Sequence, residues 1–594
     1  MPVLASGGRR RGLHLAGAAV ALGALSAALG VPTAAHADLP GASPVLARAP
    51  YLTDLTPTSV RVTWATTTRS RQTVKYGPLG NCTANSVTST VLGTTITVNG
   101  LTRYTNSVTV PNLSPDTPYC YRVYTGDATP IDLLGTNPSP EFSTMVPDGS
   151  TTPFTFAVLG DWGDTTSNGV NSGAVNQDQA NVLSRLAASG ARFTLATGDV
   201  AYPSGSQTNY GDLQQSGVNI SGVFAPEYYA APGQKIPMFA VNGNHGRNTT
   251  LLPTWPESAV TAASNGVYSQ VSYPSFFGSD PATYPTTYYA FTSGGVRFYM
   301  LDASWSDSNT GTADGNNCEG TDHCAIYQVD AAAHWATTSA EYQWLQQDLA
   351  AHPGGLKVAA FHFPLRSDDP TEPDDEYLKN NPGSTDTLEQ LLHDNGVNLV
   401  FNGHSHIYQR NVAPPGGVPS YVTGGGGARL SSIGSHGCDP TDAYALGWSY
   451  SSNVGKRCPT STPIPAADAN VHHFLLVSVN GSTLTVTPTD SLGNQFDAQT
   501  YDFTADGTAP SAPSPLTVTR PASTTMKLTW GASTDDRQLA TYDVYRNGTY
   551  MATVPKEVLT FSDKTAVCPA SYSYEVRARD LAGNTAGTTT PVTC

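Results

Sequence analysis

Five apolar runs in the middle of the chain, each ending in a turn with polar side chains, constrain the fold most strongly. Amphipathic segments at 176–190 and 385–396 lie between some of these runs and predict helices. Strands that alternate with helices predict an α/β domain whose functional residues project from the carboxyl ends of the strands. The runs are FTFAVLGD (154–161), RFTLATGD (192–199), IPMFAVNGNH (236–245), LKVAAFHFP (356–364) and VNLVFNGH (397–404).

The segment before this region shows the alternating pattern of a β-sandwich. Residues 38–150 contain SVRVTWAT and YCYRVYTG between Pro and Gly signals. Trp64 and the stretch LSPDTPYCYRV resemble the fibronectin type III family. We expect Trp64, Tyr119 and Tyr121 to pack in the core of this sandwich rather than to contact a ligand.

A linker, DGTAPSAPSPL, precedes a second sandwich that resembles the fibronectin type III modules appended to secreted bacterial enzymes. Trp530, Tyr542, Tyr545 and Tyr574 occupy strand positions in it. Modules of this kind space or tether an enzyme, and the alternative is that these aromatic side chains bind a polysaccharide or cell-wall glycan. The chain is therefore expected to be multidomain, with domains at 38–150, 151–505 and 506–594.

The first 37 residues have the pattern of a secretory signal peptide. Three arginines at 9–11 precede the apolar stretch 13–31, and Ala35-His36-Ala37 provides a small-residue cleavage site. The triple arginine also permits twin-arginine export. No later segment offers about 18 uninterrupted apolar residues, so we expect no membrane-spanning helix and a secreted, extracellular protein.

Eight cysteines in an exported chain predict disulfides, and none has the spacing of a zinc ribbon. Pairing between neighbours along the chain is our prediction, although the sequence alone leaves the connectivity open. The second pair lies in a long polar insertion at 302–340. The predicted pairs are Cys82–Cys120, Cys318–Cys324, Cys438–Cys458 and Cys568–Cys594.

The formal net charge of -16 disfavours binding to a nucleic-acid polymer, because a phosphate backbone requires a positive surface. A small anionic substrate would instead need a local positive centre. The polar residues after the five runs combine carboxylate, phenolate and amide oxygens with imidazoles, which is the mixture that first-row transition metals prefer. His404 and His406 are one residue apart, so in an extended segment they would face the same way and reach two adjacent metal positions.

These motifs resemble the purple acid phosphatases, within the calcineurin-like metallophosphoesterases. The resemblance covers roughly residues 45–505 and implies a central four-layer α/β metallophosphoesterase domain. The matching blocks are Gly160-Asp161-Trp162-Gly163, Gly198-Asp199-Val200-Ala201-Tyr202, Gly243-Asn244-His245, the run that ends in His362, and Gly403-His404-Ser405-His406.

The resemblance implies a dinuclear metal centre in which Asp199 bridges two ions. A tyrosinate ligand, Tyr202, favours ferric iron at the first position, and the second would hold Fe(II), Zn or Mn. Two ions would supply hydroxide for attack on phosphorus. The implied ligands are Asp161, Asp199, Tyr202 and His406 for the first ion, and Asp199, Asn244, His362 and His404 for the second.

His245 is the candidate catalytic residue, placed to donate a proton to the leaving alkoxide or to hydrogen-bond a phosphate oxygen. The alternative role for His245 is to orient Asn244. Gly246 departs from the family pattern, which has an acidic residue after GNH. Val358 lies four residues before His362, where the family spacing is three.

The segment after His362 lacks the histidines that plant members use to bind substrate. Arg247, Arg366 and Arg410 are candidate replacements, and an ordinary surface or supporting role is the simpler interpretation of each. Glycines 424–427 lack the pattern of a nucleotide loop and are expected to form a turn with close backbone approach near the metal site. His472 and His473 are expected to be structural.

Three functional hypotheses remain open from the sequence. The leading hypothesis is a secreted acid phosphatase that hydrolyses small phosphate monoesters. A phosphodiesterase or nucleotidase would use the same site. The third is a surface glycan-binding protein whose phosphatase domain is inactive.

Overall fold

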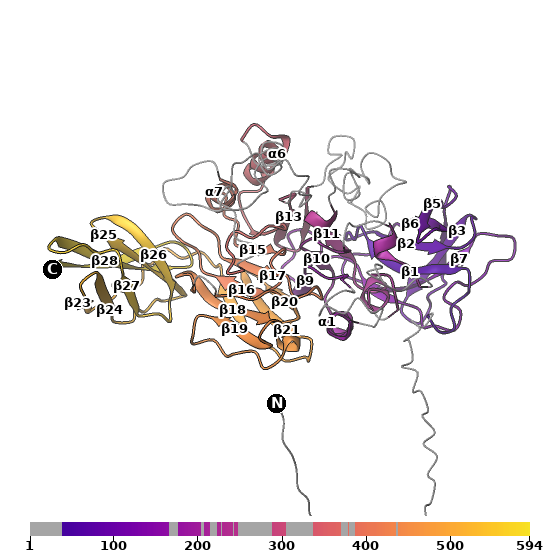
Figure 1. The fold of residues 1–594 in the computed structure, drawn as a ribbon. Coiled ribbons are helices and arrows are strands. Elements are labelled where there is room, and N and C mark those ends of the chain that lie inside the picture. The colour runs from indigo at the N-terminus through magenta and orange to yellow at the C-terminus, as the bar shows by residue number, and fades with distance from the viewer. Residues whose placement is uncertain are drawn as a thin grey trace, which may run out of the picture. The chain divides into compact units, whose positions relative to one another are not determined.

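The computed structural model describes residues 39–164, 176–202, 207–213, 223–226, 228–241, 243–246, 288–303, 337–369, 378, 387–434 and 437–594. The predicted signal peptide, Arg247 and most of the polar insertion, including Cys318 and Cys324, lie outside the described residues. Figure 1 labels the strands and helices in chain order.

Two four-stranded antiparallel sheets form the first sandwich. Trp64 and Tyr121 are fully buried in its core, as predicted, whereas Tyr119 is half-buried. The predicted disulfide Cys82–Cys120 is confirmed, with an S–S distance of 2.03 Å. One sheet has the order β1 (Leu46–Thr53), β2 (Val60–Thr66), β6 (Leu101–Val110), β5 (Thr94–Val98), and the other β4 (Asn85–Thr88), β3 (Gln72–Pro78), β7 (Pro118–Thr125), β8 (Glu141–Ser143).

Two mixed sheets form the central domain, and the five predicted apolar runs become β9, β10, β11, β14 and β15. The six-stranded sheet has the order β11 (Met238–Ala240), β10 (Thr194–Ala196), β9 (Phe154–Leu159), β20 (His473–Asn480), β21 (Thr483–Asp490), β22 (Gln499–Asp502). The eight-stranded sheet has the order β12 (Tyr289–Ser293), β13 (Val296–Met300), β14 (Leu356–Ala360), β15 (Leu399–Asn402), β17 (Ser420–Thr423), β16 (Tyr408–Asn411), β18 (Asp442–Ser449), β19 (Val454–Cys458).

The two sheets pack face to face through aromatic rings, with Phe156 of β9 5.1 Å from Phe298 of β13 between ring centroids. Alternate residues of β9 face opposite ways: Phe156 packs between the sheets, and Leu159 packs with the helix that covers the outer face. Leu345 and Leu391, from two other helices, pack against the outer face of the eight-stranded sheet. The result is the predicted layering of helix, sheet, sheet and helix.

Each long helix of the described chain begins at a residue that caps it. Asn176, Ser339 and Thr387 accept a hydrogen bond from a backbone N–H in the first turn, which satisfies a donor that has no partner within the helix. These helices are α1 (Gln177–Ala188), α6 (Ala340–Ala351) and α7 (Leu388–Asp394). Short helical turns are α2 (Gln207–Tyr210), α3 (Ala230–Gly233), η2 (Asn244–Gly246) and η4 (Asp468–Asn470).

A second β-sandwich lies at the carboxyl end of the chain. Trp530, Tyr542 and Tyr574 are buried in its core, so these three are not available to a glycan, whereas Tyr545 is half-buried under the Arg577 guanidinium. Its sheets have the order β23 (Leu516–Ala522), β24 (Thr525–Trp530), β27 (Thr560–Asp563) and β26 (Thr549–Pro555), β25 (Leu539–Arg546), β28 (Ser571–Asp580), β29 (Thr585–Thr593).

The disulfides Cys438–Cys458 and Cys568–Cys594 form as predicted. The remaining predicted pair, Cys318–Cys324, falls outside the described residues. None of the helices in the described ranges is both long and apolar enough to span a bilayer.

Candidate metal centre

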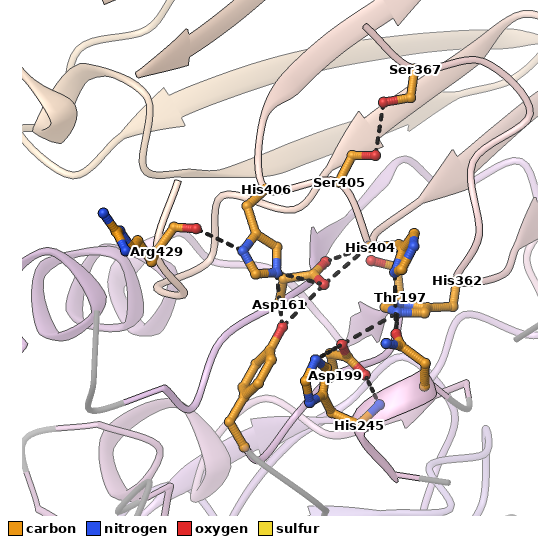
Figure 2. A network of polar contacts seen from close by, with 12 residues as sticks. Asp161, Thr197, Asp199, His245, His362, Ser367, His404, Ser405, His406 and Arg429 are labelled. Atoms are coloured by element: carbon orange, nitrogen blue, oxygen red, sulfur yellow. Dashed lines mark hydrogen bonds and ion pairs between the residues drawn. The ribbon is translucent and has the colours of Figure 1, made fainter. Parts of the chain in front are cut away.

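The ends of five strands bring the predicted donor residues together. β9, β10 and β11 run parallel in one sheet, and β14 and β15 run parallel in the other. Parallel strands present their carboxyl ends at the same edge, so the loops that follow can converge. Figure 2 shows Asp161, Asp199, His362, His404 and His406 at this junction.

Three of the donor residues hold left-handed backbone conformations. The φ angles are 55° for Asp161, 46° for Asp199 and 68° for His404. Few residues other than glycine adopt this region, and such strain persists only where the surrounding structure enforces it. The backbone therefore directs these side chains toward one point.

Two glycines let the donor loops approach one another closely. A Cβ atom on Gly243 would lie 2.1 Å from Asp199 Oδ1, and one on Gly403 would lie 2.5 Å from Asp161 Oδ2. Real Cβ atoms do not come this close to other atoms, so a side chain at either position would displace a carboxylate.

One group of donors consists of Asp161, Tyr202 and His406. The Tyr202 hydroxyl lies 3.0 Å from His406 Nε2 and 3.4 Å from Asp161 Oδ1. His406 Nε2 lies 3.5 Å from the same carboxylate oxygen. Three donor atoms from three loops thus face a common centre.

A second group consists of Asp199, Asn244, His362 and His404. Asn244 Oδ1 lies 2.7 Å from His362 Nε2 and 3.2 Å from His404 Nδ1. His362 Nε2 is 3.4 Å from Asp199 Oδ2. Donor atoms of Asp161, Asp199 and His362 also all lie within 4.8 Å of one another, which places the two groups side by side.

Backbone carbonyl groups set the orientation of two imidazoles. His362 Nδ1 lies 2.8 Å from the Thr197 carbonyl oxygen, and His406 Nδ1 lies 2.7 Å from that of Arg429 (Figure 2). Because each Nδ1 faces a carbonyl oxygen, Nδ1 carries a proton, and Nε2 is the nitrogen that points at the donor group. This is the arrangement by which proteins direct a histidine nitrogen at a metal ion.

The sequence did not point to Thr197, Arg429 or Ser367 as parts of the site. The first two act through their backbone carbonyl groups, which carry no side-chain signature. The Ser367 hydroxyl lies 2.7 Å from the hydroxyl of Ser405, the residue between His404 and His406 in the chain (Figure 2). Only the three-dimensional contact identifies these residues.

The loop that carries His404 and His406 is not extended, so the prediction that the two side chains face the same way from an extended segment was wrong. The backbone N–H of Ser405 donates to the Gly403 carbonyl at 2.8 Å, and that of Ile407 to the Ser405 carbonyl at 2.7 Å. These tight turns, together with the left-handed His404, send the two imidazoles to different donor groups. His404 faces Asn244, and His406 faces Tyr202.

Charge in the site is concentrated on buried carboxylates. Burial alone would raise the pKa of Asp199, but the imidazoles of His362, His245 and His404 hold that pKa well below its usual range. Burial lowers the pKa of His406, yet the Asp161 carboxylate raises it to about 9. Carboxylates that are buried this completely need cationic partners.

Tyr202 has the opposite electrostatic environment. Burial, and then the carboxylates of Asp199 and Asp161, raise the pKa of its hydroxyl well above the usual value. The phenol is therefore neutral in these surroundings, and only a strong local positive charge would allow it to ionise. The donor set of carboxylates, amide, phenol and imidazoles fits a pair of first-row transition metal ions.

His245 lies at the open side of the site. Its side chain is 33% exposed, and Nε2 lies 4.0 Å from Asp199 Oδ2. Its backbone N–H donates to Asp199 Oδ1 at 2.9 Å, and its ring packs 4.4 Å from that of Tyr202. His245 thus borders both donor groups while remaining accessible.

Two of the arginines considered as phosphate contacts are engaged elsewhere. Arg366 makes a two-pronged ion pair with Glu389, at 2.7 and 2.8 Å. Arg410 makes a similar pair with Asp497. Both support the fold around the site. The third candidate, Arg247, is outside the described residues.

Glycines 424–427 lie close to the backbone of neighbouring loops, as predicted. A Cβ atom on Gly424 would lie 2.0 Å from the Ser405 carbonyl oxygen, and one on Gly426 would lie 2.3 Å from that of Gly160. The buried rings of His472 and His473 pack behind this segment, and His473 Nε2 is 3.1 Å from Thr423 Oγ1. Both histidines are structural in this arrangement.

Comparison with known families assigns the class of the protein. Residues 154–408 match the calcineurin-like phosphoesterase family, and residues 49–145 match the purple acid phosphatase N-terminal domain. The central domain is therefore a calcineurin-like phosphoesterase, a class that implies a site for two metal ions. Residues 49–145 and 154–408 thus carry the two domains that these family models describe.

Individual relatives agree with this assignment. Purple acid phosphatase 15 of Arabidopsis thaliana is 25% identical over 366 residues, which is 57% of this chain and 58% of the relative. The chain thus spans less than two thirds of that relative's length. Chitinase C of Streptomyces lividans is 43% identical over 77 residues, 13% of this chain and 12% of that protein, and the carboxyl-terminal region resembles such modules.

A solved structure shows the same fold. The purple acid phosphatase PPD1 from seeds of yellow lupin, Lupinus luteus, superposes with a TM-score of 0.50 at 16% identity. The match covers 76% of this chain and 74% of the lupin chain. At this identity the likeness concerns the fold alone.

Proposed function

We propose that the protein is a secreted acid phosphatase that hydrolyses small phosphate monoesters at a dinuclear metal centre. The observation that carries the proposal is the division of seven buried or half-buried donors into two adjacent groups, in which Asp199 belongs to the second group and has a donor atom within 4.8 Å of one of Asp161. Three disulfides in the described chain support an oxidising, extracellular location.

In this proposal, Asp161, Tyr202 and His406 would hold the first ion, and Asn244, His362 and His404 would hold the second. Asp199 would serve as a ligand of both. The phenolate of Tyr202 favours ferric iron at the first position, with Fe(II), Zn or Mn at the second. When bound, such a pair supplies the Lewis acidity that activates water and stabilises charge on the phosphoryl oxygens.

The chain's own residues complete the chemistry. The depressed pKa of Asp199 keeps the bridging carboxylate ionised at acidic pH, where an acid phosphatase works. The Thr197 carbonyl accepts from Nδ1 of His362 and so directs Nε2 of this ring toward the proposed second ion. His245, accessible at the rim, donates a proton to the leaving alkoxide.

The carboxyl-terminal module serves as a spacer or tether in this proposal. Burial of Trp530, Tyr542 and Tyr574 leaves a glycan-binding role to Tyr545 and its neighbours. Sedimentation of the purified protein with chitin and with cellulose tests that alternative. If the protein sediments with a polysaccharide and Tyr545→Ala does not, the module binds glycan. If the wild-type protein sediments with neither, the module acts as a spacer.

The test of the proposed function combines elemental analysis, a visible absorption spectrum and two substrates. We expect two metal ions per chain, a tyrosinate charge-transfer band, and faster turnover of p-nitrophenyl phosphate than of bis-p-nitrophenyl phosphate. Preference for the diester would assign the site to phosphodiesters instead. A protein that retains no metal and turns over neither substrate would contradict the proposal.

A further inference from the structure

We propose that the first sandwich is an integral part of the metal centre, and that Arg48 of β1 is a positioning residue for the Tyr202 loop. The inference rests on the proposed metal centre and adds to it a residue that lies outside the phosphoesterase domain. It assigns the first sandwich a role in metal binding.

The side chain of Arg48 extends out of the first sandwich and binds residues 207–211, which follow Tyr202 in the chain. Its side chain is fully buried, and Nε donates to the Gly211 carbonyl at 2.7 Å. Nη1 and Nη2 donate to Gln207, to the side-chain Oε1 at 2.9 Å and to the backbone carbonyl at 3.1 Å. The guanidinium also lies 4.6 Å above the Phe224 ring. A single side chain thereby fixes both ends of a short turn.

Further contacts join the same two segments. The backbone N–H of Leu213 donates to the carbonyl of Ala47, the residue before Arg48, at 2.7 Å. Arg103, on β6, forms a buried ion pair of 2.7 Å with Asp212. Burial lowers the pKa of Arg48 to about 10. Two guanidinium groups and a carboxylate withdrawn from water are maintained only by exact partnering, so this contact is specific rather than incidental.

Aromatic rings connect β1 with the loops that carry the predicted metal ligands. Tyr51, also on β1, lies 4.9 Å from Phe224 and 6.3 Å from Tyr229 between ring centroids. Tyr229 in turn lies 5.2 Å from Trp162, the residue after Asp161. β1 of the sandwich therefore packs, through two rings, against the first metal loop.

The first two metal loops also interlock with each other. The backbone N–H of Trp162 donates to the Asp199 carbonyl at 3.2 Å, and that of Tyr202 to the Gly163 carbonyl at 3.3 Å. A shift of the segment held by Arg48 would therefore be transmitted to Asp161, Asp199 and Tyr202 together. Because the first ion depends on all three, its affinity should be the property most sensitive to Arg48.

Two lysine substitutions separate this role from a general structural one. Arg48→Lys keeps the positive charge and removes the guanidinium group, whose nitrogens donate hydrogen bonds to Gln207 and Gly211. The matched control is Arg122→Lys. Arg122 likewise donates to a side-chain oxygen, that of Asp132, and to two carbonyls, those of Gly135 and Asn137, but entirely within the sandwich. Metal affinity is measured for both by competition with a chelator, along with the melting temperature of the metal-free protein and the tyrosinate band.

We expect Arg48→Lys to weaken binding of the first ion by about 10- to 100-fold, the usual range for residues that orient metal ligands. Its tyrosinate band should shift or weaken and should recover in excess metal. Arg122→Lys should bind metal as the wild type does. If Arg48→Lys fails to fold, Gln207→Leu removes one acceptor from the opposite side and should lower metal affinity in the same direction.

The outcomes distinguish this inference from the proposed function. If the wild-type protein binds two ions and Arg48→Lys and Gln207→Leu bind them with the same affinity, the positioning role is wrong. The proposed metal centre is then unaffected. Equal losses in Arg48→Lys and Arg122→Lys also overturn it, because stability of the sandwich would then explain both. A wild-type protein without metal overturns the proposed function and this inference together.

Discussion

Asn244 Oδ1 lies within hydrogen-bonding distance of two imidazoles at once, 2.7 Å from His362 Nε2 and 3.2 Å from His404 Nδ1. The three residues come from three loops and from both sheets of the central domain. An amide oxygen shared between two ring nitrogens indicates a common centre, and it shows why the second donor group depends on the packing of one sheet against the other.

Asp199→Ala should remove both metal ions and abolish hydrolysis, because the proposed bridging carboxylate serves both positions. Elemental analysis of the purified variant is the measurement. An Asp199→Ala protein that kept both ions would show that the bridge is misassigned. Asp502→Ala, in a half-exposed carboxylate of β22, is a control that should retain two ions.

Tyr202→Phe should eliminate the visible charge-transfer band while leaving the ring packing of the site in place. The Tyr202 hydroxyl approaches both Asp161 and His406, so its loss should also weaken the first metal position more than the second. Absorption spectroscopy together with stepwise metal release by a chelator measures both effects. Persistence of the band would assign it to another group.

His245→Ala should retain both metals and lose mainly turnover. The imidazole borders the donor groups without belonging to either, and loss of a general acid lowers the rate about 10²- to 10⁴-fold. A substrate with a good leaving group should be affected less than an alkyl phosphate, because it needs no proton. Equal losses for the two substrates, or loss of metal, would favour the role of orienting Asn244.

Gly403→Ala should disrupt metal binding through the backbone alone. The added Cβ would lie 2.5 Å from Asp161 Oδ2, so the carboxylate or the last loop must move. Gly354→Ala is the matched control, since no atom lies within 4 Å of the Cβ that it adds. Metal content should fall in the first variant only, and equal content in both would show that the loop has room to adjust.

His473 should make the fold less stable as the pH falls. Burial lowers its pKa from 6.5 to about 4, so between these values the unfolded chain takes up a proton that the folded chain does not. The stabilising contribution is complete above pH 6.5 and is lost as the pH approaches 4, by about 3 kcal/mol in all. His473→Gln should flatten the pH dependence of the free energy of unfolding across this interval. An unchanged slope would show that other groups dominate it.

The strands of the central domain could be predicted from the sequence because local patterns encode them, and the predicted donor residues lie at the ends of these strands. Each apolar run is bounded by turn residues, and β9 packs its alternate side chains on opposite faces. The turn at His404 could not be predicted, since a left-handed histidine is imposed by tertiary contacts rather than by its neighbours in sequence.

Arg48 shows most clearly what sequence patterns miss. It lies in the strand LARAPYLT, where an arginine gives no sign of being fully buried. Its partner Gln207 is 159 residues away in the chain. A contact between residues so far apart depends on how two domains pack, and no periodicity or motif reports it. The contacts of the Thr197 and Arg429 carbonyl groups with the histidines could not be predicted either, because every residue has a backbone carbonyl group.

The left-handed backbone at Asp161, Asp199 and His404 has a consequence for how ions enter. These loops already bring the predicted ligands together, so binding of ions at the proposed centre should replace protons and hydrogen bonds without refolding of the loops. Capture of a cation is then a competition with hydrogen ions for the same nitrogen and oxygen atoms. Acidity of the surroundings should therefore govern whether the proposed centre fills with metal ions.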